Sequence, residues 1–542
     1  MTETTQHVRP LPADDALADI STIHDLGRVY FCGIGGSGMS VLAQMLHQDG
    51  VEVTGSDRVD SAYTQHLRED GIPVIIGQSA ENIHDVDTVV WSSAIPADAP
   101  EMTAALAQGL RLAHRSDILA VLLKSHRSIA VAGTHGKTTT SSMIATILST
   151  AGEQFADPSF AIGGSLKTSH GTIPGGYVGK GEWMVAEADE SDGSFEKYRP
   201  AIAVITNAEG DHLDHYGDVP TYRKAFVEFA AHATQGVVLC ADDEGAREVF
   251  AASSDAVATR TVLYSTQTSS EIARVLPGGL RGARFVQISQ AHEIAAQAEE
   301  DSDAAGVSET AAQGVAAEAN EVAESFDIQL PHDLDATDSV RTVDLHIPGI
   351  HNARNASAAI TACVLAGVDA SAAVQGVGAF LGAARRFDFQ GEVNGVRLYN
   401  DYAHHPTEVS VLLEAMRRRF PHRTLRVLFQ PHTYSRTKIY TRELVDALKK
   451  ADDIVLSHLF AAREESSDFP GISSQTLIDM ANSEGVGERF SLIDDMREAG
   501  RTLAERSSHG DVIVTVGGGD INRADPVILE ALESSAPKGR EA

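Results

Sequence analysis

The sequence predicts an α/β protein with three domains, each built on a parallel sheet with helices packed against it. Short apolar segments that suit buried strands alternate with helix-like segments along most of the chain. Glycine-rich turns follow two of these strands, at residues 33–38 and 133–137, and each turn opens a helix. The chain has 542 residues, which is too many for one hydrophobic core and indicates three domains of ordinary size.

The composition restricts the partners and the compartment of the protein. The chain carries 43 basic and 76 acidic residues, a formal net charge of −33, which argues against nucleic acid or an anionic membrane as partner. The first residues are polar, and no apolar run reaches about 18 residues, so we expect no signal peptide, no membrane insertion and a cytoplasmic protein. Cys32, Cys240 and Cys363 are scattered among apolar residues and indicate buried free thiols.

The first third begins with a strand at residues 28–32, a glycine-rich turn and an apolar helix at 39–46. The turn has glycines at positions one, three and six, and an acidic residue follows about 20 positions later, after a strand at 52–56. This pattern supplies backbone donors for a diphosphate and a carboxylate for a ribose, which suits a uridine diphosphate as well as NAD. The candidate ligand contacts are Gly35, Gly36, Ser37, Gly38 and Asp57.

Two further strands of this domain are expected at residues 74–76 and 88–91. The second strand ends in Ser92 and Ser93, at the edge where an open parallel sheet receives its ligand. We therefore predict that both serines contact the uridine diphosphate. An ordinary junction between strand and loop is the alternative.

The second glycine-rich turn predicts a triphosphate site. Residues 128–132 are small and apolar, as in a buried strand, and residues 139–148 have helical spacing. Between them the glycines and the helix start would face an anion, Lys137 supplies a positive charge, and Thr138 offers a hydroxyl to magnesium. Val131 occupies the position of the first glycine in the full motif, so a simple helix start is the alternative. The candidate ATP contacts are Gly133, Thr134, His135, Gly136, Lys137, Thr138 and Thr139.

The middle third places acidic residues at two successive strand ends. A strand at 183–186 runs directly into residues 187–192, which contain four carboxylates, and a strand at 201–206 precedes further acids and two histidines at 207–215. Parallel strands present their ligands at these ends, and magnesium prefers oxygen ligands. We predict metal or phosphate contact for Glu187 and His212, with a solvated acidic surface as the alternative.

Residues 291–324 differ in composition from the rest of the chain. They contain nine acidic residues and neither lysine nor arginine. Such a segment buries too little apolar surface to offset its ordering entropy, so we expect a mobile insertion or a solvated helix without catalytic work. Strands are expected again at 326–330 and 343–347, and an alanine-rich helix opens within residues 348–356.

The last third predicts another parallel sheet. Strands at 396–399, 424–429, 453–457 and 512–516 alternate with helices at 409–417 and 441–449. Polar residues gather after the strands, at 400–408, 430–437 and 517–521. The adjacent His404 and His405 suggest zinc, but consecutive residues rarely face one ion and no cysteine is near. We expect these histidines to form hydrogen bonds and to orient substrate.

Together these segments resemble the Mur ligase family over nearly the whole chain. The resemblance rests on the order and spacing of motifs at residues 33–39, 133–139, 187–192, 206–214, 351–356, 385–387, 401–408 and 429–432. The shortened phosphate loop is the usual form in this family. The resemblance implies an N-terminal Rossmann-like UDP-binding domain (28–124), a central P-loop ATPase-type domain (125–382) and a C-terminal Rossmann-like domain (383–535), between polar tails at 1–27 and 536–542.

The resemblance also implies a reaction that belongs to peptidoglycan precursor synthesis. ATP would phosphorylate the lactyl carboxylate of UDP-N-acetylmuramate, and the amine of L-alanine would attack the acyl phosphate to form an amide. The implied cofactors are ATP and Mg²⁺, with Thr138, Glu187 and His212 as metal ligands. The implied ATP contacts outside the phosphate loop are Asn355, Arg386 and Asp401, and the implied catalytic residues are Lys137, His212, His404 and Arg436.

The sequence departs from the family pattern at three positions. Thr433 stands where the family usually has arginine, Gln78 where a histidine is common, and Arg463 where glycine is common. Other members use a carbamylated lysine near the position of Phe226, which this chain cannot. The alternatives are a murein-peptide recycling ligase, a dinucleotide-dependent oxidoreductase and a nucleotide-binding assembly protein without turnover. We expect a monomer or a homodimer.

Overall fold

The computed structural model describes residues 20, 22–168, 171–293, 322–337, 339–462 and 464–534. The chain forms two compact units. The first comprises Met1–Gln290, Asp327–Val343 and Arg354–Phe380, and the second comprises Ala291–Phe326, Asp344–Ala353 and Leu381–Ala542. Among the helices of the described residues, none is both long enough and apolar enough to cross a membrane.

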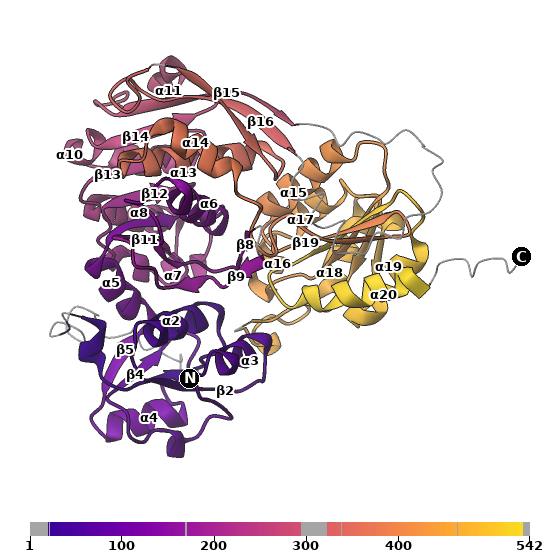
Figure 1. Cartoon of the computed structure of the whole chain (residues 1–542). Coiled ribbons are helices and arrows are strands. Elements are labelled where there is room, and N and C mark those ends of the chain that lie inside the picture. The colour runs from indigo at the N-terminus through magenta and orange to yellow at the C-terminus, as the bar shows by residue number, and fades with distance from the viewer. Residues whose placement is uncertain are drawn as a thin grey trace, which may run out of the picture. The chain divides into compact units, whose positions relative to one another are not determined.

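A five-stranded parallel sheet near the N-terminus has the order β3-β2-β1-β4-β5 (Figure 1). Its strands are β1 (Val29–Cys32), β2 (Val53–Asp57), β3 (Val74–Ile76), β4 (Thr88–Trp91) and β5 (Arg111–His114). The helices that follow these strands are α2 (Ser37–Gln48), α3 (Ala62–Glu69), α4 (Pro100–Ala107) and α5 (Arg115–Ser125). The strand order is that of a Rossmann-type sheet, in which ligands bind beyond the carboxyl ends of the strands.

A ten-stranded sheet has the order β10-β7-β11-β6-β12-β13-β14-β15-β16-β17. Its strands are β6 (Arg127–Ala132), β7 (Ser159–Ala161), β10 (Gly176–Tyr177), β11 (Trp183–Glu187), β12 (Ile202–Ile205), β13 (Gly236–Cys240), β14 (Thr261–Ser265), β15 (Arg284–Glu293), β16 (Glu324–Gln329) and β17 (Val340–Leu345). The central strands β11, β6, β12 and β13 are mutually parallel and apolar, as expected of strands buried on both faces. A separate antiparallel pair joins β8 (Leu166–Thr168) and β9 (Gly171–Ile173).

Helices of this region connect the strands and bury their apolar sides on the sheet. They are α6 (Lys137–Thr150), α7 (Leu213–Tyr216), α8 (Val219–His232), α9 (Glu244–Ala252), α10 (Asp255–Ala258), α11 (Ser269–Val275), α13 (Ile350–Leu365) and α14 (Ala370–Gly378). Phe226 of α8 is fully buried and packs edge-on against Phe195 and Tyr222. The position near which other family members carry a carbamylated lysine is therefore part of an aromatic cluster.

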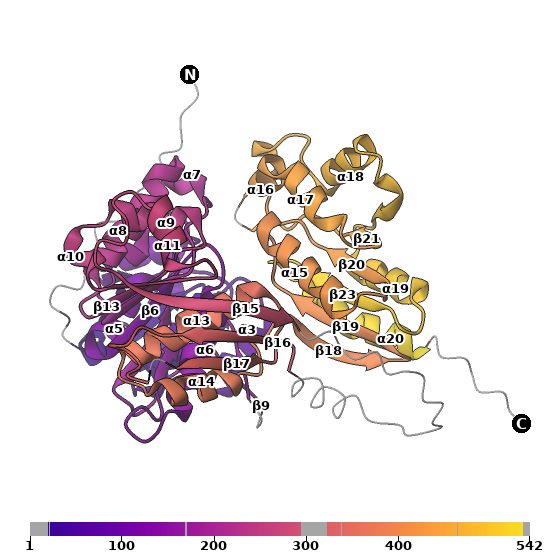
Figure 2. The same ribbon diagram turned by 90° about the horizontal axis from the view of Figure 1, so that it is seen from above.

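The sheet of the second unit has the order β18-β19-β23-β20-β21-β22, with β18 antiparallel to β19 and the other pairs parallel. Its strands are β18 (Asp388–Val393), β19 (Val396–Asp401), β20 (Leu425–Phe429), β21 (Asp453–Leu456), β22 (Phe490–Leu492) and β23 (Val512–Val516). The helices are α15 (Pro406–Arg419), α16 (Tyr434–Ile439), α17 (Thr441–Leu448), α18 (Ser474–Ser483), α19 (Met496–Arg506) and α20 (Asp525–Ser534). Two separate cores lie on its two faces, and Figure 2 shows α15 and α17 on one side and α19 and α20 on the other. The α/β fold class is thus confirmed.

The first and last residues of the predicted insertion at 291–324 lie in strands. β15 extends to Glu293 and β16 begins at Glu324, because pairing within the sheet continues through both ends of the low-complexity segment. Residues 294–321 lie outside the described part of the chain. The expectation of a mobile insertion or a solvated helix for these residues stays a prediction.

Candidate functional site

The phosphate loop joins β6 to α6 in a conformation that only glycine adopts readily. Gly133 has φ +142° and Gly136 has φ +83°. A Cβ on Gly133 would lie 2.0 Å from Oγ1 of Thr206, and a Cβ on Gly136 would lie 2.6 Å from Oδ1 of Asn355. The loop therefore packs directly against Asn355, which the resemblance places in the same ATP site.

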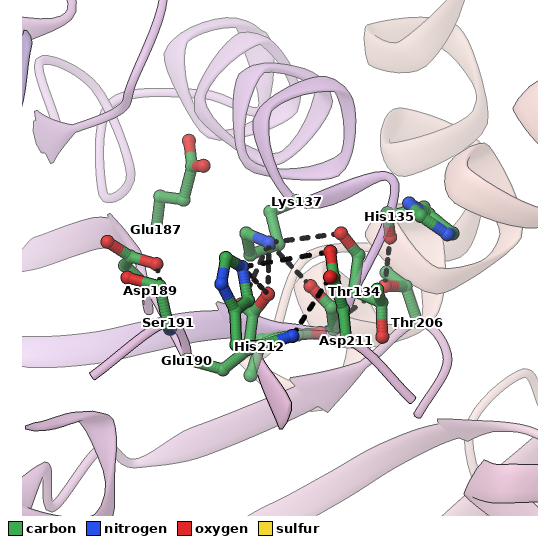
Figure 3. A network of polar contacts seen from close by, with 12 residues as sticks. Thr134, His135, Lys137, Glu187, Asp189, Glu190, Ser191, Thr206, Asp211 and His212 are labelled. Atoms are coloured by element: carbon green, nitrogen blue, oxygen red, sulfur yellow. Dashed lines mark hydrogen bonds and ion pairs between the residues drawn. The ribbon is translucent and has the colours of Figure 1, made fainter. Parts of the chain in front are cut away.

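Lys137 begins α6, and its ammonium group is enclosed by acceptors. Nζ donates to the carbonyl oxygen of Gly133 at 2.7 Å and to that of Thr134 at 3.2 Å, and lies 2.8 Å from Oε2 of Glu190 (Figure 3). Burial opposes the charge, but nearby carboxylates, above all Glu190, outweigh it and raise the pKa of Lys137. Lys137 is thus a positive charge held in place at the start of the helix.

The remaining loop residues are fastened to the segment after β12. The backbone N–H of His135 donates to Oδ1 of Asn207 at 3.0 Å, and its carbonyl accepts from Oγ1 of Thr206 at 2.6 Å. Oγ1 of Thr134 donates to the carbonyl of Glu209 at 2.6 Å and lies 2.8 Å from the hydroxyl of Tyr222. These contacts fix the loop to the segment after β12 and to α8, and none of them involves the ammonium group of Lys137.

Thr138 and Glu187 form a pair of oxygen ligands suited to a metal ion. Oγ1 of Thr138 lies 3.0 Å from Oε2 of Glu187, which also accepts from the N–H of Gly163 at 2.9 Å. Adjacent ligands of an octahedral magnesium ion at about 2.0–2.1 Å are themselves separated by about 3 Å. Both the donor type and the spacing therefore fit Mg²⁺.

His212 lies close to the same cluster in the first unit. Its φ is +51°, and its Nε2 is 3.7 Å from Oδ2 of Asp211 and 4.0 Å from Oε1 of Glu190. Glu190 is 1% exposed and contacts Lys137, so it links the histidine to the phosphate loop. Burial raises the pKa of Glu190, and Lys137 opposes that rise.

The N-terminal glycine-rich loop is held by the carboxylate expected to meet a ribose. Oδ2 of Asp57 accepts from the N–H of Gly35 at 2.9 Å, and the N–H of Gly36 donates to the carbonyl of Gly33 at 3.1 Å. Ser37 and Gly38 form the first turn of α2, where backbone donors favour an anion. Asp57 therefore shapes the loop in this structure in addition to any contact with ligand.

The two serines after β4 have different surroundings, because Ser92 is buried and Ser93 bonds to the acidic segment. Ser92 is 8% exposed, and its carbonyl accepts from the N–H of Ile95 at 2.9 Å. The hydroxyl of Ser93 donates to Oδ2 of Asp192 at 3.2 Å, in the acidic segment that follows β11. The structure therefore brings the edge of the first sheet together with the acidic segment.

The predicted residues of the second unit gather at the carboxyl ends of β19 and β20. Asp401 accepts from the N–H groups of Phe387 and Ala403 at 2.7 and 2.8 Å, and burial raises the pKa of Asp401 to about 6. Arg386 lies 3.9 Å from Glu408, whose carboxylate is also 3.4 Å from Nδ1 of His404. These contacts place Arg386, Asp401 and His404 in one neighbourhood.

Arg436 occupies the short helix α16 after β20. Its Nη1 donates to the carbonyl of His432 at 2.9 Å and lies 3.1 Å from Nδ1 of the same residue. The rings of His432 and His404 meet edge-on, with centroids 5.1 Å apart, so the two strand-end clusters are neighbours. Thr433, at the position that is usually arginine, donates to Oε1 of Glu464 at 2.7 Å.

Reasoning from the sequence missed the roles of Glu190 and Arg115. Glu190 was visible only as one of four acids after β11, and nothing in its spacing indicates that it would reach Lys137. Arg115 follows β5 outside any motif, yet its guanidinium donates to Asp189 at 2.7 Å. A cation placed directly at the end of a parallel strand is the signal that could have identified Arg115.

Three family models match successive parts of the chain. They are described as "Mur ligase family, catalytic domain" (residues 28–127), "Mur ligase middle domain" (131–363) and "Mur ligase, glutamate ligase domain" (385–519). The chain belongs to the Mur ligase family. The domain boundaries predicted from the sequence, which lie near these limits, stay predictions.

Individual Mur ligases are similar to the chain over nearly its full length. A UDP-N-acetylmuramate–L-alanine ligase of Bifidobacterium adolescentis is 50% identical over 96% of each chain. A protein of the same name from Renibacterium salmoninarum is 39% identical, covering 95% of this chain and 98% of its own. The crystal structure of UDP-N-acetylmuramate–alanine ligase from Thermotoga maritima superimposes with a TM-score of 0.72 at 25% identity, covering 94% of this chain and 99% of its own. These matches do not favour the recycling ligase or the oxidoreductase.

Other departures from the family pattern remain without a structural account. Gln78 is half-buried after β3, and Arg463 lies outside the described residues. The three cysteines are free and buried, as expected.

Proposed function

We propose that this Mur ligase joins L-alanine to the lactyl carboxylate of UDP-N-acetylmuramate at the expense of ATP. The observation that carries the proposal is the 50% identity, over 96% of each chain, to a protein named for that reaction. The geometry supports it, because the family's phosphate loop is present with Lys137 charged and enclosed, beside the oxygen pair of Thr138 and Glu187. Cytoplasmic location and oligomeric state stay predictions.

Activation precedes bond formation because a carboxylate is a poor electrophile. A lactyl carboxylate oxygen bonds to the γ-phosphorus of ATP, and ADP leaves. The alanine nitrogen then attacks the acyl carbon, and the tetrahedral intermediate loses a proton from nitrogen and expels phosphate to leave the amide. Alignment of three substrates is worth roughly 7–11 kcal/mol in favourable cases.

The residues of the chain divide this work. Lys137 and the loop amides would bind the β- and γ-phosphates, and Asn355, packed against Gly136, would meet the adenine. Thr138 and Glu187 would hold Mg²⁺, with His212 as the ligand of a second ion. When bound, Mg²⁺ neutralises the charge that develops on the transferring phosphoryl group.

In the second unit, Arg386 would contact the phosphates and Asp401 the ribose of ATP, while His404 and Arg436 would lie near the reacting groups. The loop at Gly35–Gly38, with Asp57, Ser92 and Ser93, would bind the uridine diphosphate. The N–H of Gly35 already donates to Oδ2 of Asp57, which fixes the shape of this loop before any ligand binds and supports its proposed role.

The test is phosphate release by the purified full chain with ATP, Mg²⁺ and UDP-N-acetylmuramate, scanned over the standard amino acids and a murein tripeptide. We expect L-alanine to stimulate release and to yield the amide product by mass spectrometry. Stimulation by the tripeptide alone would replace this proposal with the recycling activity, and no stimulation by any acceptor would overturn it.

Lys137→Ala sharpens the test by separating the two nucleotide sites. We expect turnover to disappear while UDP-N-acetylmuramate binding, measured by calorimetry, is retained, because the hydrogen bonds of Lys137 within the described part of the chain run to its own loop and to Glu190. Lys124→Ala, an exposed lysine of α5, is the matched control and should leave both unchanged. Loss of both properties in Lys137→Ala would contradict the assignment of separate sites.

A further inference from the structure

Arg115, the first residue of α5, connects the first sheet to the acidic segment after β11. Its Nη2 donates to Oδ2 of Asp189 at 2.7 Å and to Oδ2 of Asp192 at 3.2 Å. The side chains of Arg115 and Asp192 are 14% and 11% exposed, whereas that of Asp189 is 37% exposed, so the pair with Asp192 is the better shielded from water. Removal of Arg115 would leave the buried Asp192 carboxylate without its cation, which is costly.

The other end of the guanidinium faces the N-terminal glycine-rich loop. Nη1 of Arg115 lies 3.6 Å from the position of a Cβ on Gly38, the second residue of α2. Arginine presents its donors as a rigid planar fork, so one guanidinium serves partners on two sides at once. Arg115 therefore extends from the loop assigned to uridine diphosphate to the acidic segment.

Two neighbours of Arg115, Ser93 and His114, also lie close to the carboxylate of Asp192. The hydroxyl of Ser93 donates to Oδ2 of Asp192 at 3.2 Å, and Nε2 of His114 lies 3.8 Å from the same oxygen. Arg115 and Ser93, at the edge of the first sheet, thus both donate to one carboxylate of the acidic segment, and the ring of His114 lies beside it.

The acidic segment carries the groups that contact the phosphate loop. Glu190 lies between Asp189 and Asp192 in the sequence, and its Oε2 is 2.8 Å from Nζ of Lys137 (Figure 3). Glu187, at the end of β11, bonds Thr138. A shift of the acidic segment would therefore displace the partners of both Lys137 and Thr138.

We propose that Arg115 is a positioning residue that couples occupancy of the loop at Gly38 to nucleotide binding at Lys137. A diphosphate beside Gly38 is balanced by the Nη1 end of the guanidinium while the Nη2 end keeps the acidic segment in place. Each ligand therefore binds better when the other is present, and the effect is reciprocal. The inference rests on the proposed function, because it takes UDP-N-acetylmuramate and ADP as the two ligands.

The test measures the dissociation constant of ADP with Mg²⁺ by calorimetry, with and without saturating UDP-N-acetylmuramate. We expect the sugar nucleotide to tighten ADP binding about fivefold or more in the unaltered protein, within the range of about 5–150-fold typical of coupled sites. Arg115→Gln should reduce this factor to below about twofold. Arg115→Lys, which keeps the charge and loses the fork, should give an intermediate factor and covers the case in which Arg115→Gln does not fold.

The matched control breaks a contact between α5 and the short helix Ser194–Lys197, which follows the acidic segment. Nζ of Lys197 donates to Oδ1 of Asp117 at 2.7 Å and to Oγ of Ser116 at 2.8 Å, without touching Asp189 or Asp192. We expect Lys197→Gln and Arg115→Gln both to lower the melting temperature, but only Arg115→Gln to change the coupling factor.

The outcomes distinguish the inference from the proposed function. A coupling factor of one in the unaltered protein, an unchanged factor in the Arg115 variants, or an equal loss in Lys197→Gln would overturn the role of Arg115. Absence of any UDP-N-acetylmuramate binding to the unaltered protein would overturn the proposed function instead.

Discussion

Asp525 is expected to make the second unit less stable as the pH rises toward neutrality. Asp525 lies at the start of α20 and is 5% exposed. Its Oδ1 accepts a hydrogen bond from Oγ1 of Thr515 in β23 at 2.6 Å. Burial raises the pKa of Asp525 from 3.8 to about 7, against the smaller lowering effect of the Thr515 hydrogen bond.

The sign follows from proton linkage. Between pH 4 and 7 the unfolded aspartate has lost its proton and the native one keeps it, so the native state binds more protons and loses stability as the pH rises. Below about pH 4 the carboxyl group of Asp525 is protonated in both states, so its burial does not reduce the free energy of unfolding there. Each pKa unit corresponds to about 1.4 kcal/mol, so the loss reaches about 4 kcal/mol above pH 7.

Asp525→Asn removes this titration while keeping an acceptor for Thr515. We expect the variant to match the unaltered protein near pH 4 and to exceed its stability by up to about 4 kcal/mol at pH 8, which is about a 10³-fold difference in exchange. The assay is hydrogen exchange of the β23 amides, compared at each pH so that the intrinsic exchange rates cancel. Exchange of one strand avoids the assumption that a chain of several domains unfolds in two states.

Glu488→Gln, an exposed carboxylate of the same unit, is the matched control and should leave the pH dependence unchanged. If the difference between Asp525→Asn and the unaltered protein stays constant from pH 4 to 8, the carboxylate titrates normally and burial is not the controlling effect.

The remaining predictions concern the phosphate loop and the segment after β12. Gly136→Ala should lower the free energy of unfolding by about 1 kcal/mol or more and weaken ATP binding, because the new Cβ would meet the side chain of Asn355. Gly152→Ala is the control, because Gly152 has φ +106° but nothing within 4 Å of the position of a Cβ. It should be strained in the same way and leave the ATP affinity, measured by calorimetry, unchanged. Asp243→Ala should lower stability by about 1 kcal/mol and reduce turnover, because Oδ1 of Asp243 caps α9 and also accepts from the N–H of Ala208 at 2.9 Å, four residues before His212. Asp218→Ala, which removes only the cap of α8, should destabilise similarly with turnover unchanged, and equal turnover losses would refute the role of Asp243.

The local elements were predictable because local chemistry specifies them. The apolar runs at β3, β4 and β23 were predicted with the bounds that the structure has, and the glycine-rich turns were placed correctly before α2 and α6. Positive φ values at Gly133 and Gly136 explain why the loop needs glycine at those positions, whereas Val131 lies within β6, where no such constraint exists. The ends of the acidic segment overlap two strands, since β15 ends at Glu293 and β16 begins at Glu324, which composition alone does not reveal.

The sequence by itself determined the fold class, the family and the order of the motifs, since hydrophobic periodicity, glycine turns and motif spacing are properties of neighbouring residues. Only the tertiary structure decided which charges meet: Lys137 with Glu190, Thr138 with Glu187, and Arg115 with Asp189 and Asp192. These partners are separated by 49 to 77 residues and come from different strand ends. Their contact depends on how parallel strands are ordered in the sheet and how one sheet edge faces another, which local sequence does not encode. The glycine-rich loop at Gly133 thus predicts an anion site, while the folded chain supplies the carboxylates of Glu190 and Glu187 that contact Lys137 and Thr138.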